Sequence, residues 1–70
     1  MKHVLVKKSS HIMSVGYDPD RREMQIAFHN GKTYSYPNVP EHVHKTMMVT
    51  GSKGEYFHRH INSKFKGVEL

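Results

Sequence analysis

The chain contains no cysteine among its 70 residues and no long apolar run. Without cysteine there is neither a disulfide framework nor a thiolate zinc site, the usual supports of very small secreted proteins. No stretch approaches the roughly 20 apolar residues that a membrane-spanning helix needs, and the N-terminus lacks the apolar segment of a signal peptide. We therefore expect a soluble, unprocessed, cytoplasmic protein that does not associate with membranes.

Acidic residues are scarce toward the two ends of the chain, which leaves a formal net charge of +5. Residues 1–10 hold three lysines and no acid, residues 11–50 are balanced, and residues 51–70 hold four cations against two acids. Clustered cations gain affinity for a phosphate backbone by releasing its counterions. This distribution favours an anionic partner, nucleic acid being the commonest. The alternative is a surface whose charge serves solubility alone.

Alternation of apolar and polar residues predicts β-strands in the first half of the chain. Residues 10–17 place Met13, Val15 and Tyr17 on one face, with Ile12 out of phase. A short apolar run just before this segment either extends the strand or forms a separate one. A Pro-containing turn then leads into a second, cleanly alternating strand.

An Asn-Gly pair at 30–31 predicts a hairpin, because both residues tolerate positive φ. A two-residue turn would put Tyr34 and Tyr36 on the polar side of the preceding strand. A three-residue loop with a bulge at the glycine instead pairs Phe28 with Lys32 and gathers all apolar side chains on one face. We favour the second register, since register follows the buried face.

Two short helices are expected after the hairpin. Asn38 and Glu41 have the spacing of a capping box, and Gly51 is a natural helix stop. Ser52 and Glu55 repeat the capping-box spacing and open a second helix of one to two turns. The apolar positions of the two helices are Val39, Val43, Met47, Phe57 and Ile61. The predicted fold is a single α+β domain, 1–70, in which a three-stranded antiparallel meander is packed on one side by two short helices, with a core of about 9–65 and a basic tail at 62–70.

An ordered set of short motifs spans about residues 9–65: Ser9-Ser10, Val15-Gly16-Tyr17-Asp18-Pro19, Phe28 with Gly31, Tyr34-x-Tyr36, Val39-Pro40, and Gly54-x-Tyr56-Phe57 ending at Ile61. This set resembles the KTSC domain family, which is named for its occurrence at the C-terminus of some lysyl-tRNA synthetases and also occurs as stand-alone bacterial and phage proteins. The resemblance implies a small domain for which RNA binding has been suggested, centred on the Tyr-x-Tyr element.

Cations and aromatic residues supply the candidate nucleic-acid contacts. Ser52, Lys53 and Gly54 put a small residue, a cation and a flexible backbone at a helix N-terminus, where free amides attract phosphate; an ordinary helix cap is the alternative. Exposed tyrosines would stack on unpaired bases, whereas buried ones would fill the core. The predicted nucleic-acid-binding residues are Lys53, Arg59, Lys64, Lys66, Tyr34 and Tyr36.

The histidines do not form a recognisable metal site. His42 and His44, like His58 and His60, are two residues apart on predicted helices, so each pair points about 200° apart and cannot chelate one ion. A site across the two helices, such as His44 with His60, remains an alternative. No serine or histidine lies in a motif typical of a catalytic nucleophile, such as a nucleophile elbow. We predict a protein that is not an enzyme and has no metal or cofactor.

RNA or single-stranded nucleic-acid binding is the leading functional hypothesis. The alternative is a protein-interaction module, or a small phage-type inhibitor, that docks on a protein partner through a helical face bearing His44, Met48 and His58. Methionine suits such repackable interfaces. A free edge strand on so short a sheet is compatible with either a monomer or a weak dimer.

Overall fold

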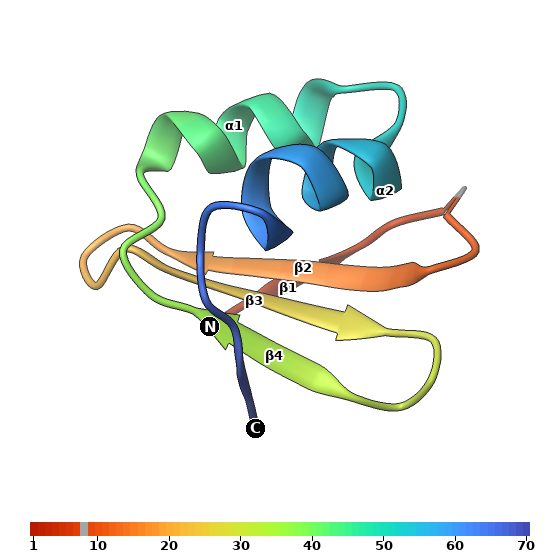
Figure 1. The fold of residues 1–70 in the computed structure, drawn as a ribbon, viewed down its shortest axis with the longest axis horizontal. Helices are drawn as coiled ribbons and strands as arrows, with labels where there is room; N and C mark the ends of the chain where they lie inside the picture. The colour runs from red at the N-terminus through yellow and green to blue at the C-terminus, as the bar shows by residue number, and fades with distance from the viewer. Residues whose placement is uncertain (8) are drawn as a thin grey trace.

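The computed structural model, which describes residues 1–7 and 9–70, contains an antiparallel sheet with helices on one face (Figure 1). Lys8, one of the three N-terminal lysines, lies outside the described residues. The strands follow one another across the sheet in chain order, β1-β2-β3-β4-β5. The elements are β1 (His3–Leu5), β2 (Ile12–Asp18), β3 (Glu23–Phe28), β4 (Thr33–Tyr36), α1 (Glu41–Val49), α2 (Lys53–Tyr56), the π-helical segment η1 (Phe57–Asn62) that continues α2, and β5 (Val68–Glu69).

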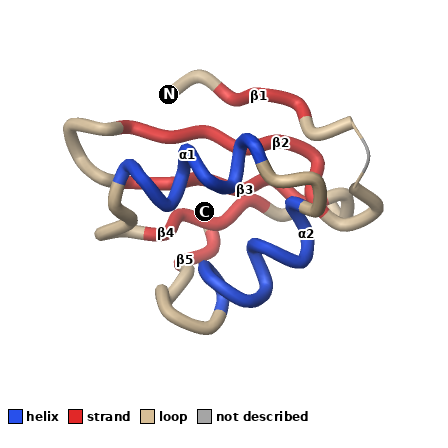
Figure 2. Tube along the Cα trace, turned by 90° about the horizontal axis from the view of Figure 1, so that it is seen from above, coloured by secondary structure: helices blue, strands red, loops and turns tan. Residues whose placement is uncertain are grey.

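The helical layer covers the middle of the sheet and leaves its first strand free. Figure 2 shows α1 running above β2 and β3, with β1 uncovered at the edge. In the described part of the chain, no helix has both the length and the apolar character needed to cross a bilayer. Among the residues that the structure describes, no helix lies on the second face of the sheet, and the buried core lies on the helical side (Figure 1).

The predicted α+β class and the β2-β3-β4 meander are confirmed, but the prediction of three strands is wrong. The described residues form five strands, because a short strand is added at each edge. β1 is the separate N-terminal strand that the sequence pattern left open. β5 arises from the predicted basic tail, where the Leu70 amide donates to the Thr33 carbonyl at 2.9 Å. Two residues are too few to show strand periodicity, so contact with β4 creates this strand.

The β3-β4 hairpin has the favoured three-residue register. The Phe28 amide donates to the Lys32 carbonyl at 2.8 Å, and Gly31 has a φ of 89°. Tyr34 consequently lies opposite Ile26, on the apolar face of the hairpin. The buried face and the glycine bulge together determine this register.

β2 departs from the predicted alternation at Met13. The register against β3 shifts between Ile12 and Ser14, which is a bulge that adds one residue to β2. Ile12 is therefore fully buried together with Val15, whereas Met13 is 39% exposed. The prediction that Met13 shares the face of Val15 is wrong, because the bulge resets the side-chain alternation.

The first helix begins without the predicted capping box. α1 starts at Glu41 after Pro40, and no side chain caps it. Asn38 instead has a φ of 64° in the preceding turn, a left-handed conformation that asparagine tolerates better than most residues. The Val39 amide donates to the Arg22 carbonyl at 2.9 Å. This bond ties the turn to the β2-β3 connection and explains why Asn38 does not cap the helix.

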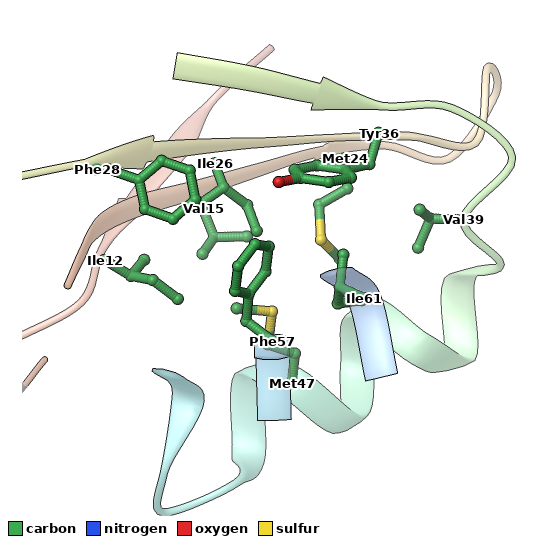
Figure 3. Close-up of a cluster of buried hydrophobic side chains, with 10 residues drawn as sticks. All are labelled: Ile12, Val15, Met24, Ile26, Phe28, Tyr36, Val39, Met47, Phe57 and Ile61. Atoms are coloured by element: carbon green, nitrogen blue, oxygen red, sulfur yellow. The ribbon is translucent and has the colours of Figure 1, made fainter. Parts of the chain in front are cut away.

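The core lies between the covered sheet face and the helices (Figure 3). Phe57 reaches from the helical layer to the sheet and packs edge-on against Phe28 and Tyr36, with ring centroids 5.4 and 5.6 Å away. Burial raises the pKa of the Tyr36 phenol. The buried cluster comprises Ile12, Val15, Met24, Ile26, Phe28, Tyr36, Val39, Met47, Phe57 and Ile61. The predicted pair Phe57 and Ile61 thus closes the core from above.

Candidate functional site

A groove separates the β1-β2 connection from the loop that joins α1 to α2. Its volume is about 790 Å³. One wall is formed by residues 4–7 and 9–11, and the other by Met48 and residues 50–54. Both segments lie at the same end of the molecule in Figures 1 and 2. The groove therefore brings together two regions that are far apart in the sequence.

The groove is positively charged. Lys7 and Lys53 lie on opposite walls, and none of the described residues that line the groove is acidic. Lys53 Nζ donates to the Thr50 carbonyl at 3.2 Å, which holds the ammonium group near the α1-α2 loop. Hydroxyl groups from both walls, including those of Ser10 and Ser52, add hydrogen-bonding capacity. These groups together can bind an anion.

Ser9 shapes the first wall by turning the chain into β2. Its Oγ accepts hydrogen bonds from the amides of His11 and Ile12, at 3.2 and 3.0 Å. On the facing wall, a Cβ added to Gly54 would lie 3.6 Å from Ser9 Oγ, an ordinary contact distance. The two walls therefore come close at this point, where a larger side chain than glycine would reach Ser9.

A polar network on the uncovered sheet face holds β1, and thus the first wall, in place. His3 Nε2 lies 3.2 Å from Gln25 Oε1, and His3 Nδ1 lies 3.0 Å from Ser14 Oγ. Gln25 Nε2 and Ser35 Oγ donate to Glu23 Oε2, at 3.4 and 2.6 Å. The hydrogen bond from Ser35, and to a smaller extent the one from Gln25, lowers the pKa of the Glu23 carboxyl group. His3 thereby links the edge strand to β2 and β3.

A smaller hollow of about 210 Å³ adjoins the groove and shares Thr50 and Ser52 with it. Arg59 lines this hollow and forms an exposed ion pair with Glu55, with Nε and Oε1 3.7 Å apart. His60 also lines it and packs on Tyr56, with ring centroids 4.6 Å apart. The structure thus places Arg59 next to the groove that contains Lys53.

The predicted anion site, Ser52 with Lys53 and Gly54, lies in the second wall of the groove. Ser52 does occupy the N-cap position of α2, but its side chain makes no cap hydrogen bond. α2 is only four residues long before η1 begins. The walls of the groove, rather than a long helix N-terminus, therefore define the surroundings of Lys53.

The remaining predicted contacts lie elsewhere. Lys64 and Lys66 are exposed beyond η1 and line neither hollow. Tyr36 is only 3% exposed, so its ring fills the core and is closed to a stacked base. Tyr34 is half-buried, and its hydroxyl lies 3.5 Å from Glu69 Oε1. Helices cover this face of the sheet, so the tyrosines do not form an open stacking platform.

The residues of the predicted protein-docking face differ in their surroundings, with His44 and Met48 one turn apart on α1 and His58 on η1. Met48 lines the groove, His58 is exposed, and His44 stacks on Tyr17 with ring centroids 4.6 Å apart. Burial lowers the pKa of His44, opposed by the charge of Glu41. Among the residues that the structure describes, no three histidine, aspartate or glutamate side chains converge as metal ligands would.

Sequence reasoning missed the first wall of the groove, above all Ser9, Ser10 and His11. Lys7 is one of the three lysines in residues 1–10, from which the sequence predicts only a basic N-terminal segment. The concentration of hydroxyl residues at 9–10 and 50–52 was a signal, but no local pattern shows that these two segments face each other. That information comes from the packing of the helical layer on the sheet.

Comparison with known proteins agrees with this architecture. The crystal structure of a KTSC domain protein from Yersinia pestis has a TM-score of 0.91 and 41% sequence identity, covering 99% of this chain and 96% of that one. An uncharacterized protein of Stutzerimonas stutzeri is 36% identical over 66 residues, which are 94% of this chain and 86% of the relative. A lysine–tRNA ligase of Nostoc sp. is 33% identical over 67 residues, but the chain spans only 12% of that ligase. The sequence model of the KTSC domain matches residues 8–65, nearly the predicted span, and the chain belongs to the KTSC domain family.

Proposed function

We propose that this KTSC domain is a non-enzymatic module that binds RNA or another single-stranded nucleic acid. The observation that carries the proposal is the groove between the β1-β2 connection and the α1-α2 loop, which has a lysine on each wall and no acidic lining residue. A concave surface with charge of one sign concentrates the field and attracts an anionic chain. Phosphate groups are the commonest anions that such surfaces meet.

The proposed binding path runs from the groove to the end of the helical layer. Lys53 contacts a phosphate in the groove, and Arg59 contacts the next one from the adjoining hollow. Lys64 and Lys66 are exposed on the chain that leaves η1 and extend the positive surface. Because these contacts are to phosphates, the proposed binding depends strongly on salt and weakly on base sequence.

The lysine–tRNA ligase of Nostoc sp. supports RNA as the ligand. Its name states that it acts on a tRNA, and a segment of it is similar to nearly all of this chain. A similar domain within an enzyme that acts on a tRNA supports RNA contact by this basic chain. We also propose that the protein acts in the cytoplasm, where such a ligase works on its tRNA.

Tyrosine plays a minor part in this proposal. Tyr36 is buried, whereas Tyr34 is half-buried. The buried ring has a structural role, so the cations supply the affinity. Ser52 and Gly54 contribute through the groove wall.

Charge reversal at two sites tests the proposal. We expect Arg59→Glu combined with Lys64→Glu to weaken binding to a fluorescent single-stranded RNA, measured by anisotropy. Each lost phosphate contact reduces the slope of log affinity against log salt by about 0.7, so two contacts reduce it by about 1.4.

A matched control reverses Arg21 and Lys45, which are exposed and line neither hollow. This control changes the net charge by the same amount. A difference in RNA affinity between the two double variants therefore reports the position of the charges rather than their number. An unchanged salt slope in the Arg59 and Lys64 variant would contradict the proposal. Recovery of a protein partner that persists after nuclease in high salt would instead support the protein-docking alternative.

A further inference from the structure

We infer that the groove binds one nucleoside monophosphate unit, with its phosphate between Lys7 and Lys53 and its base against the apolar part of the walls. The unit is either a free nucleotide or an unpaired nucleotide within a strand. The second case rests on the proposed function and specifies which part of the nucleic acid enters the groove.

The size of the groove favours a ligand larger than a phosphate group. Its volume of about 790 Å³ lies within the roughly 300–1,000 Å³ typical of small-molecule sites. A phosphate held by the two lysines leaves most of this space unfilled. The lining includes apolar residues as well as the lysines and serines, so a second chemical group has surfaces to contact.

Those surfaces are apolar and partly aromatic. Val6 and Met48 are half-buried in the groove walls, and the polarizable thioether of methionine packs well against flat rings. The exposed imidazole of His11 lies in the same lining, with its centroid 4.9 Å from that of Phe28. Phe28 supports the imidazole from the core. Histidine rings are among the side chains on which unpaired bases stack.

The polar groups complete the match to a nucleotide. Lys53 uses one N–H for the Thr50 carbonyl, at 3.2 Å, which leaves two for a phosphate. Lys7 approaches from the opposite wall, and the hydroxyls of Ser10 and Ser52 can bond to ribose or to base edges. Hydroxyls both donate and accept, so this lining accepts different bases. A duplex, whose bases are stacked and paired, cannot present a base to the groove.

Titrations of the isotope-labelled protein, followed by NMR, test this inference without any variant. The probes are uridine 5′-monophosphate, adenosine 5′-monophosphate, inorganic phosphate, a single-stranded RNA octamer and a duplex of the same length. We expect the nucleotides to shift the amides of residues 4–7, 9–11 and 48–54, with an affinity at least five-fold above that of inorganic phosphate. Equal affinity for phosphate, or shifts elsewhere, would overturn the inference.

Two substitutions separate the parts of the site. Lys53→Met keeps the apolar stem and removes the charge, and Met48→Ala removes the surface proposed for the base. Each should weaken nucleotide binding about five-fold, because Lys53→Met loses a charge-assisted contact with the phosphate and Met48→Ala loses the contact between the thioether and the base. Val49→Ala is the control, because Val49 neighbours Met48 yet is 83% exposed and lies outside the groove.

The outcomes distinguish this inference from the proposed function. If RNA binds but neither Lys53→Met nor Met48→Ala changes its affinity, the groove assignment fails, and RNA binding through Arg59, Lys64 and Lys66 stands. If the nucleotides bind in the groove but the octamer does not bind, the inference stands for free nucleotides and the proposed function fails. Duplex binding as tight as that of the octamer would exclude insertion of a base.

Discussion

Replacing Gly67 with alanine tests the packing of the C-terminal strand, because Gly67 lies against the buried ring of Tyr36. A Cβ at position 67 would come within 2.6 Å of Tyr36 Cε2 and 2.7 Å of Cζ. The ring is 3% exposed and packs edge-on against Phe57, with centroids 5.6 Å apart, so it has no free space to enter. The added methyl group must push the chain before β5 away from β4.

The loss of stability expected for Gly67→Ala is limited by the few contacts that β5 makes with β4. Forcing an extra carbon into a packed site costs about 1–3 kcal/mol. β5 pairs with β4 at only two positions, so detachment of β5 relieves the clash at a limited cost. We therefore expect a loss of about 1–2 kcal/mol, against a net stability of roughly 3–5 kcal/mol for a core of this size. Each kcal/mol lowers the Tm of such a domain by about 4–8 °C.

Urea and thermal unfolding followed by circular dichroism measure this loss. Gly51→Ala is the matched control, because a Cβ there has no atom within 4 Å and the φ of Gly51 is not positive. Reduced freedom of the unfolded chain should leave the control unchanged or about 0.4–1 kcal/mol more stable. If Gly67→Ala is as stable as Gly51→Ala, and the Leu70 amide stays protected from exchange, the argument for tight packing against Tyr36 is wrong.

Two further predictions concern the helical layer. Met47→Ala removes a fully buried side chain and should lower the free energy of unfolding, measured in urea, by about 2–5 kcal/mol. Val49 is 83% exposed, so Val49→Ala should change that free energy by less than about 0.5 kcal/mol. Similar values for the two variants would contradict the observed orientation of α1. Burial lowers the pKa of His44, so the unfolded chain binds more protons between that lowered pKa and the usual value of about 6.5. Stability should therefore fall as pH decreases through this window, and His44→Gln should reduce the slope of Tm against pH; an equal slope in the variant would refute this.

The sequence predicts the residues of the candidate site on the helical side but not those on the β1-β2 connection. Lys53 was predicted from its place between Ser52 and Gly54 at a helix N-terminus, and Arg59 from the excess of cations over acids in the C-terminal segment. Lys7 and His11 were not linked to them, since no rule of local sequence states that the β1-β2 connection faces the α1-α2 loop. The sequence leaves Tyr36 as a candidate for stacking on a base, but the helices cover its ring and exclude that role. Whether a tyrosine is a binding surface or a core residue depends on what covers it.

The sequence by itself determined the elements whose causes are local. Strand alternation and the Asn-Gly turn specified the β3-β4 hairpin and its register, since backbone preferences and the side-chain period act within a few residues. The tertiary structure alone decided the bulge at Met13, the strand made by Val68 and Glu69, and the groove. Each of these depends on contact between distant segments, where the free energy of packing outweighs what the local chain prefers.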